Sequence, residues 1–185
     1  VTPDHRMLEW APNKDSLHHV VMPADFGKNN IFAGAGVLDS GDTAPELLLR
    51  LAIATQADGS FSPNGAIRFG FTRDRKIQRM RTLLTQAGIE FKESYQQKHS
   101  VTAFYIADEQ ASQIKMFLTG DKKLPWSLLK LNKLAREAII EEAAFWDGHI
   151  HAEGRRYTYT SVQEQNVDVL QAIASTVGRK TTKKQ

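Results

Sequence analysis

The sequence predicts an α+β fold in which one order of helices and strands is repeated, with the second copy incomplete. Three observations predict this fold. Apolar residues recur at helical spacing in several segments, apolar and polar residues alternate in others, and the residues that end these segments recur about 89 positions later. A short β-rich segment precedes the first copy, so we divide the chain into residues 1–45, 46–131 and 132–185.

The composition is typical of a folded globular protein. Of the 185 residues, 41% are hydrophobic and 24% are charged, which excludes a disordered or fibrous chain. No apolar run approaches the roughly 20 residues that a membrane span needs, so we expect no membrane partner. The chain contains no cysteine, which excludes a disulfide scaffold, a cysteine nucleophile and a cysteine-ligated zinc ion.

The charged residues are distributed unevenly along the chain. Residues 1–45 contain 3 basic and 6 acidic residues, whereas residues 46–185 contain 21 basic and 15 acidic residues. The excess of positive charge lies in the longer segment, where it can meet phosphate groups. A solvated surface with slightly more lysine than acid explains the same counts equally well.

Residues 1–45 are expected to form strands and loops, followed by a helix. Short extended pieces at residues 18–22 and 31–38 are separated by Pro, Asn and Gly, with no sustained helical period. Thr43 and Glu46 then have the spacing of a capping box, and the apolar residues after them recur at helical spacing. This first helix should end at Asp58, which glycine follows.

The rest of the first copy alternates between strands and helices. Residues 60–72 are expected to be extended with one buried face, because every second residue from Ile67 to Phe71 is apolar. A basic amphipathic helix runs from Asp74 to Gly88. The copy is completed by two strands and a helix, at residues 90–97, 101–107 and up to about residue 120.

The same order begins again near Asn132. It predicts a helix at residues 132–145, a strand at 155–160, and a last helix that Ser161 and Glu164 cap and Gly178 ends. Matching landmarks lie 89 or 90 residues apart, and the pairs are Gly59 with Gly148, Thr72 with Ser161, and Gly88 with Gly178. Two such copies in tandem are expected to pack about a pseudo-twofold axis.

Each copy places an Asp-Gly pair at the end of its first helix. Small residues in both helices, such as Ala54 and Ala143, would let the helices approach closely and bring Asp58 and Asp147 together. Two carboxylates at such a junction repel each other unless a divalent cation lies between them, and oxygen ligands suit Mg²⁺. Taken singly, each Asp-Gly pair is explained more simply as a turn that ends a helix.

Four blocks of the sequence resemble the LAGLIDADG homing endonucleases, in the version found inside phage-type inteins. Two are the motif helices, Leu51–Ser60 (LAIATQADGS) and Ile140–Gly148 (IEEAAFWDG). The other two are Lys122–Trp126 (KKLPW), similar to the family's Lys-x-Ile-Pro block, and Tyr157–Gly178. The resemblance spans about residues 45–185 and implies αββαββα repeats.

This resemblance implies a Mg²⁺-dependent enzyme that cuts both strands of a specific double-stranded DNA site by phosphodiester hydrolysis. Asp58 and Asp147 fall on the motif acids that bind the metal, with Gly59 and Gly148 beside them in the metal site. In such a site the metal activates water and stabilises the leaving oxygen.

The resemblance also assigns a catalytic lysine. Lys122, or alternatively its neighbour Lys123, falls on the basic residue that helps to position water and neutralise charge. The compact charge of lysine suits a phosphate partner, although a solvated loop lysine is the simpler alternative.

In this family the strands of both repeats form a saddle that lies along the major groove. The strand positions expected to face DNA, or else those in the opposite phase, are Arg68, Thr72, Lys92, Gln96, Lys98, Arg155, Tyr157 and Tyr159. Basic residues at the start of the second helix either contact phosphates or form a solvated helix face, and they are Arg73, Arg75, Lys76 and Arg79.

Residues 1–8 resemble the Thr-x-x-His block of an intein splicing (Hint) domain, with Thr2 and His5 at the two named positions. In an intein this pair polarises the peptide bond at the upstream splice junction. The chain lacks the initiating Cys and a final His-Asn pair, so we do not expect it to splice alone. The two residues are an inert remnant, a strand of a broken Hint domain, or half of an arrangement that another chain completes.

The sequence departs from the family in two further ways. Ile53 and Glu142 replace glycine in the motif helices, and Gln56 replaces an acid. Two full repeats would extend to about residue 223, so we expect a continuation or a C-terminal intein fragment to supply the rest.

Three functions remain open on the sequence: an endonuclease, a DNA-binding domain that no longer cleaves, and the N-terminal fragment of a split intein whose product is a spliced protein. The resemblance places each in the cytoplasm of a prokaryotic or phage-infected cell.

Overall fold

The computed structural model describes residues 7–10, 19–21, 31–32, 36–150 and 157–183. Within these ranges the protein is a mixed α+β structure with a four-stranded antiparallel sheet and five α-helices, which confirms the α+β class of the prediction. In the same ranges, no helix has both the length and the apolar character needed to cross a membrane. Thr2, His5 and Arg155 lie outside the described residues.

The strands described within residues 1–45 form a small antiparallel sheet. β1 (Met7–Trp10) lies between β2 (His19–Val21) and β3 (Ile31–Phe32). The sequence analysis predicted β2 and β3 but not β1.

Helix α1 (Glu46–Asp58) is followed by the sheet and two further helices. The sheet has the order β4-β5-β7-β6. Its strands and the helices around them are β4 (Ser60–Phe61), β5 (Ile67–Phe71), α2 (Asp74–Ala87), β6 (Lys92–Gln96), β7 (Val101–Ile106) and α3 (Asp108–Lys115).

The alternation expected in residues 60–72 is present, but a turn divides the segment into β4 and β5. Ile67, Phe69 and Phe71 are buried, whereas Arg68 and the glycine after Phe69 are exposed. The turn needs glycine at its centre, because Gly65 has a φ of +81°, in the left-handed region that other residues rarely adopt. One face of the sheet therefore belongs to the core and the other is open.

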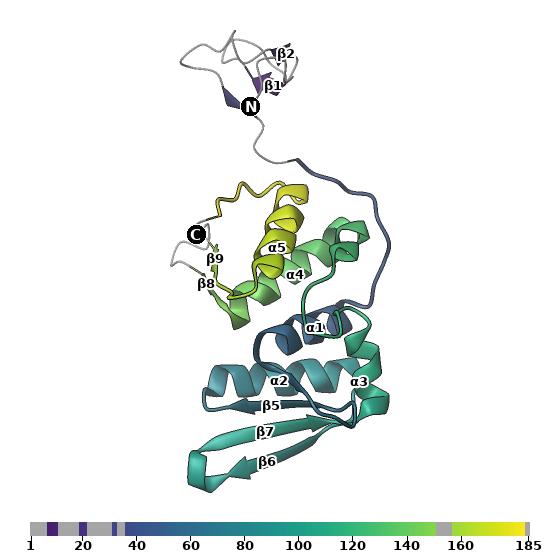
Figure 1. Ribbon diagram of the computed structural model, residues 1–185, viewed down its shortest axis with the longest axis vertical. Helices are drawn as coiled ribbons and strands as arrows, with labels where there is room; N and C mark the ends of the chain where they lie inside the picture. Colours follow the sequence, from purple (N-terminus) through teal and green to yellow (C-terminus); the bar gives the residue numbers. More distant parts are fainter. Residues whose placement is uncertain (1–6, 11–18, 22–30, 33–35, 151–156, 184–185) are drawn as a thin grey trace.

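The remaining chain forms the second half of the molecule. After a short 3₁₀-helix η3 (Trp126–Lys130) come α4 (Lys133–Trp146), the hairpin strands β8 (Gly148–Ile150) and β9 (Tyr157–Tyr159), and α5 (Glu164–Thr176). Figure 1 shows α1 lying between α2 with its sheet and the half that contains α4 and α5.

Helices α1 and α4 pack against each other through small side chains. Ala52 and Ala54 of α1 are buried, and so are Ala143 and Ala144 of α4. Each is at most 5% exposed, so the two backbones approach closely, as expected from the sequence. This contact joins residues about 90 positions apart in the chain.

The helix starts differ from the predicted capping boxes. Helix α1 begins after Pro45, and no described side chain caps it; Glu46 instead accepts a hydrogen bond from Arg50 Nε at 2.8 Å. The predicted cap of helix α5 is Ser161, but the helix begins after Gln163. Ser161 Oγ accepts the N–H of Gln163 rather than an N–H of the first helical turn. Both boxes are wrong because each helix starts too far along the chain for the hydroxyl to reach its first turn.

Helices α2 and α5, which follow the first hairpin of each half, end in the same way. Gly88 and Gly178 both have positive φ, +66° and +81°. The residue after each glycine donates its N–H to a carbonyl five positions back, from Ile89 to Leu84 and from Arg179 to Ala174. This is the hydrogen bond of a Schellman motif, and it occurs at positions 90 residues apart.

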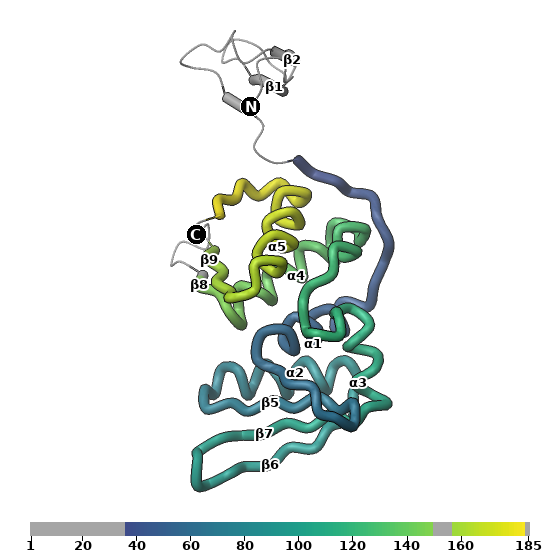
Figure 2. The backbone as a smooth tube through the Cα atoms, viewed as in Figure 1, coloured from purple at the N-terminus to yellow at the C-terminus, as the bar shows by residue number. Residues whose placement is uncertain are grey.

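Residues 36–42 are tied to the second half, although we assigned them to the N-terminal segment. The N–H groups of Gly36 and Leu38 donate to carbonyls at the end of α5, at 3.0 and 2.9 Å. Asp42 exchanges backbone hydrogen bonds with Lys130 and Asn132, both at 2.8 Å. Figure 2 shows this segment running along one side of the molecule to reach α1.

Candidate functional site

The C-terminal ends of α1 and α4 meet, and each carries an aspartate. Asp58 is the last residue of α1, and Asp147 follows the last residue of α4. Both are half-buried. The close packing of the two helices thus brings together two carboxylates from distant parts of the chain.

A glycine follows each aspartate because the backbone turns directly against its own helix. A Cβ on Gly59 would lie 2.8 Å from the carbonyl oxygen of Thr55. A Cβ on Gly148 would lie 2.7 Å from Cα of Ala144 and 2.6 Å from the carbonyl oxygen of Thr158 on the neighbouring strand β9. Real Cβ atoms do not approach backbone so closely, so the Asp-Gly pairs fix how each carboxylate leaves its helix.

Two lysines complete the cluster. Lys76, near the start of α2, places Nζ 2.5 Å from Oδ2 of Asp58. Lys122 donates from Nζ to the carbonyl oxygen of Gly59 at 2.5 Å. The structure therefore brings Lys122 to the helix ends, whereas Lys123 pairs with the exposed Asp121 of its own loop.

The charges of this cluster act on one another. Burial raises the pKa of Asp147, and the negative charge of Asp58 raises it further, while Lys76 and Lys122 oppose the rise. Burial also lowers the pKa of Lys122, against the opposing influence of Asp147 and Asp58. Two acids and two bases thus share one partly desolvated space.

The loop that carries Lys122 is held by α5. The side-chain oxygen of Asn166 accepts the N–H of Leu124 at 2.9 Å, and Gln165 Nε2 donates to the Leu124 carbonyl at 2.9 Å. Asn166 is 1% exposed, so this contact is shielded from water. Lys122 itself has a φ of +66°, which the loop maintains.

Tyr159 lies beside the helix ends rather than on an open strand face. Its hydroxyl donates to Oε1 of the buried Gln56 at 3.1 Å, and burial raises its pKa. Tyr157 is half-buried, with the guanidinium of Arg179 4.8 Å from its ring centroid. These two tyrosines, which we expected to face DNA, engage groups of the chain itself.

The predicted DNA-facing positions of the first half share the open face of the sheet. The strand register places Arg68 opposite Tyr105 and Tyr105 opposite Lys92, so their side chains lie on one side. The Arg68 guanidinium stands 5.7 Å from the Tyr105 ring centroid. Thr72 and Gln96 are also exposed. The prediction of a strand position at Lys98 is wrong, because the chain turns there between β6 and β7 and Lys98 lies in a short 3₁₀-helix, η2 (Gln97–His99).

The basic residues of α2 do not form a single solvated face. Arg75 donates to the carbonyl oxygen of Phe145 at 2.9 Å, and its guanidinium lies 4.9 Å from the Phe145 ring centroid. Arg79 pairs with the buried Glu142 of α4. Arg73 is exposed, and it remains the best placed of the four to contact a phosphate.

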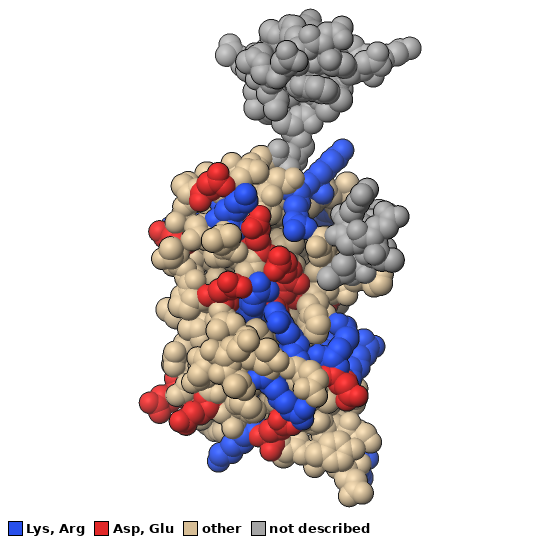
Figure 3. Space-filling model, turned by 180° about the vertical axis from the view of Figure 1, so that it is seen from behind, with Lys and Arg blue, Asp and Glu red and all other residues tan. Residues whose placement is uncertain are grey.

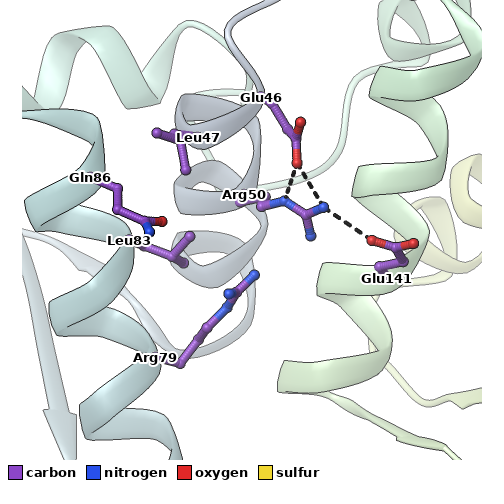
Figure 4. A pocket seen from close by; sticks show the side chains of 7 residues that line it. All are labelled: Glu46, Leu47, Arg50, Arg79, Leu83, Gln86 and Glu141. Carbon is purple, nitrogen blue, oxygen red and sulfur yellow. Dashed lines mark hydrogen bonds and ion pairs between the residues drawn. The ribbon is translucent and has the colours of Figure 1, made fainter.

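Glu142, which stands where the resembling family has glycine, is 1% exposed and fully engaged. It accepts hydrogen bonds from Trp146 Nε1 at 2.7 Å, from Arg50 at 3.1 Å and from Arg79. Figure 4 shows Arg50 between Glu46 and Glu141 at the rim of an open pocket of about 390 Å³. Neither Asp58 nor Asp147 lines this pocket, so it is a feature of the helix junction apart from the aspartates.

The carboxylates can take part in binding a divalent cation, with ligands completed from outside. Asp58, Asp147 and the Gly59 carbonyl supply hard oxygen atoms, which suit Mg²⁺. Within the described residues, no three His, Cys, Asp or Glu side chains gather in a cluster. Lys76 now neutralises Asp58, so a cation that binds this carboxylate would have to replace the contact with Lys76.

Sequence reasoning missed the role of Lys76, since no pattern sets it apart from the basic residues around it.

Comparison of the chain with protein-family models and with curated protein sequences gives no match.

Proposed function

We propose that residues 46–185 form a LAGLIDADG-type DNA endonuclease domain of an intein, which cleaves double-stranded DNA with Mg²⁺. The observation that carries the proposal is the junction of α1 and α4, where Asp58 and Asp147 meet beside Lys122. The resemblance assigns the same three positions to metal binding and catalysis. Helix, hairpin and helix also follow in the same order twice within residues 36–150 and 157–183.

The chain's own groups have distinct tasks in this proposal. Asp58 and Asp147 would hold the cation, and the glycine after each one lets the backbone turn closely against its helix, which fixes where the carboxylate lies. Lys122 directs its ammonium group to the same space and favours a phosphate oxygen there. When bound, Mg²⁺ would supply a polarised water as nucleophile and a counter-charge for the leaving oxygen.

The open face of the sheet supports DNA binding near this centre. Arg68 and Lys92 lie on that face together with polar and small residues, and the acidic Glu93 lies on the other face of the edge strand. A twisted sheet of this kind fits the major groove, which admits strands. Figure 3 shows the molecule from behind, and on that side basic and acidic side chains are interspersed.

A second candidate is DNA binding without cleavage. The ion pair between Lys76 and Asp58 favours it, because the ammonium group occupies an oxygen that a catalytic cation needs.

In either case we propose that residues 1–45 belong to the splicing part of the intein, with Thr2 and His5 as its functional pair.

The decisive test uses DNA that carries the intein-free form of the host gene. The protein is incubated with this DNA in Mg²⁺ and, as a control, in EDTA. We expect a Mg²⁺-dependent double-strand break at one position. Binding without any break would favour the second candidate, and neither binding nor breakage would contradict both.

A further inference from the structure

The Asp58 carboxylate already has a cationic partner supplied by the protein. Lys76 reaches it from α2, with Nζ 2.5 Å from Oδ2. The side chains are 13% and 28% exposed, so the pair is partly shielded from water. A contact of this kind is stronger than an ion pair on an open surface.

The ammonium group of Lys76 also lies over an aromatic ring. Lys76 Nζ stands 5.6 Å from the centroid of the Trp146 ring, at the end of α4. The ring is held in position, since Trp146 is 3% exposed and its Nε1 donates to Glu142 at 2.7 Å. A lysine that leaves the carboxylate can therefore keep a favourable contact with the aromatic face.

We propose that Lys76 is an internal counter-ion that competes with a divalent cation for Asp58 and so sets the cation concentration at which the site fills. This inference rests on the proposed function, because it takes Asp58 as a metal ligand. The ion pair holds the carboxylate in place while the site has no cation. Entry of the cation displaces Lys76 toward Trp146, which leaves the ammonium beside the site.

Lys122 does not play this part. Its ammonium donates to the Gly59 carbonyl rather than to a carboxylate oxygen, and its loop is anchored to α5 through Leu124. We therefore expect a substitution of Lys76 to change the affinity of Asp58 for a cation and to leave the hydrogen bond of Lys122 intact.

The experiment measures Tb³⁺ binding to the full chain by luminescence sensitised through tryptophan, at constant pH and ionic strength and without DNA. The variant Lys76→Met removes the charge and keeps an unbranched side chain that is one atom shorter. Lys76→Arg keeps the charge. Lys115→Met is the matched control, because it breaks another lysine–aspartate pair, with Asp108 at 2.7 Å, on a different helix. Asp58→Asn identifies the part of the signal that depends on the site.

We expect Lys76→Met to bind Tb³⁺ roughly tenfold more tightly than the wild type, because a positive charge in contact with the ligand has gone. Lys76→Arg and Lys115→Met should stay within about twofold of the wild type. Thermal unfolding shows whether Lys76→Met folds, and Lys76→Gln provides the same charge change with a polar side chain of similar length. Equal Tb³⁺ affinity in the wild type and both neutral variants would overturn the role of Lys76 alone. Absence of any binding that depends on Asp58 would overturn the metal site of the proposed function as well.

Discussion

At the scale of single residues, Asp147 combines burial with a nearby like charge. Its pKa is raised first by burial and then by Asp58, so the folded protein binds this proton more tightly than the unfolded chain does. Ionisation of Asp147 therefore costs folding stability. The cost sets in as the pH rises above the ordinary pKa of 3.8 and is complete above the raised value.

Replacing Asp147 should accordingly stabilise the chain without metal. We expect Asp147→Asn to raise the free energy of unfolding by about 1 kcal/mol at pH 7, as substitutions at functional sites often do. The gain should shrink as the pH falls from the raised pKa toward 3.8, and it should be absent below 3.8, where the wild-type carboxyl is neutral in both states. Urea unfolding in EDTA at several pH values measures it, and a gain that does not vary with pH would argue against this origin.

Glu142 presents the opposite case of a buried charge that is fully paired. Replacing it with alanine leaves Arg50, Arg79 and Trp146 Nε1 without their shared acceptor, so we expect a loss of about 3–5 kcal/mol in the free energy of unfolding. The control is Glu141→Ala, since the Glu141 carboxylate is 51% exposed and pairs with Arg50 at the surface. That variant should lose at most about 1 kcal/mol. Similar losses for the two would show that burial of the pair contributes little.

At the scale of secondary-structure elements, the junction of α1 and α4 depends on where each helix ends. Gly148→Ala would push a methyl group into Cα of Ala144 and the backbone of the paired strand. We expect this to cost about 1–3 kcal/mol of unfolding free energy. Gly120→Ala is the control, because its Cβ would meet nothing within 4 Å. Thermal unfolding compares the two, and an unchanged melting temperature for Gly148→Ala would contradict the close turn.

Sequence periodicity predicted the elements better than it predicted their ends. The alternation of Ile67, Phe69 and Phe71 gave the buried strand face, because burial acts at every second residue. Thr43 and Ser161 matched a capping pattern, yet α1 and α5 start at positions where those hydroxyls do not cap. Local patterns do not contain the tertiary packing that decides where a helix begins.

The candidate site shows the same limit. The Asp-Gly pairs at Asp58 and Asp147 could be identified from the sequence, since a recurring motif and small helix residues indicated that they meet. Lys76 could not, because its role arises from the packing of α2 beside the end of α1. Tyr159 alternates like a surface residue, but its hydroxyl turns to Gln56.

At the scale of the whole molecule, DNA binding should use the open face of the sheet. We expect Arg68→Ala to weaken binding to the intein-free site by about five- to tenfold. It should also reduce the slope of the logarithm of affinity against the logarithm of salt concentration by the amount that about one phosphate contact contributes. Arg81→Ala is the control, since Arg81 is engaged with Glu93 at 2.5 Å. Binding measured over a range of salt concentrations tests this, and equal effects of both variants would place the DNA elsewhere.

The central claim is that Asp58 and Asp147 form one metal-dependent cleavage centre at the junction of two helices. The most direct measurement compares how the wild type and Asp58→Asn cleave the intein-free site in Mg²⁺. We predict that Asp58→Asn makes no double-strand breaks, or only nicks one strand, while it binds the site within a few fold of the wild type. Undiminished double-strand cleavage by Asp58→Asn would contradict the claim.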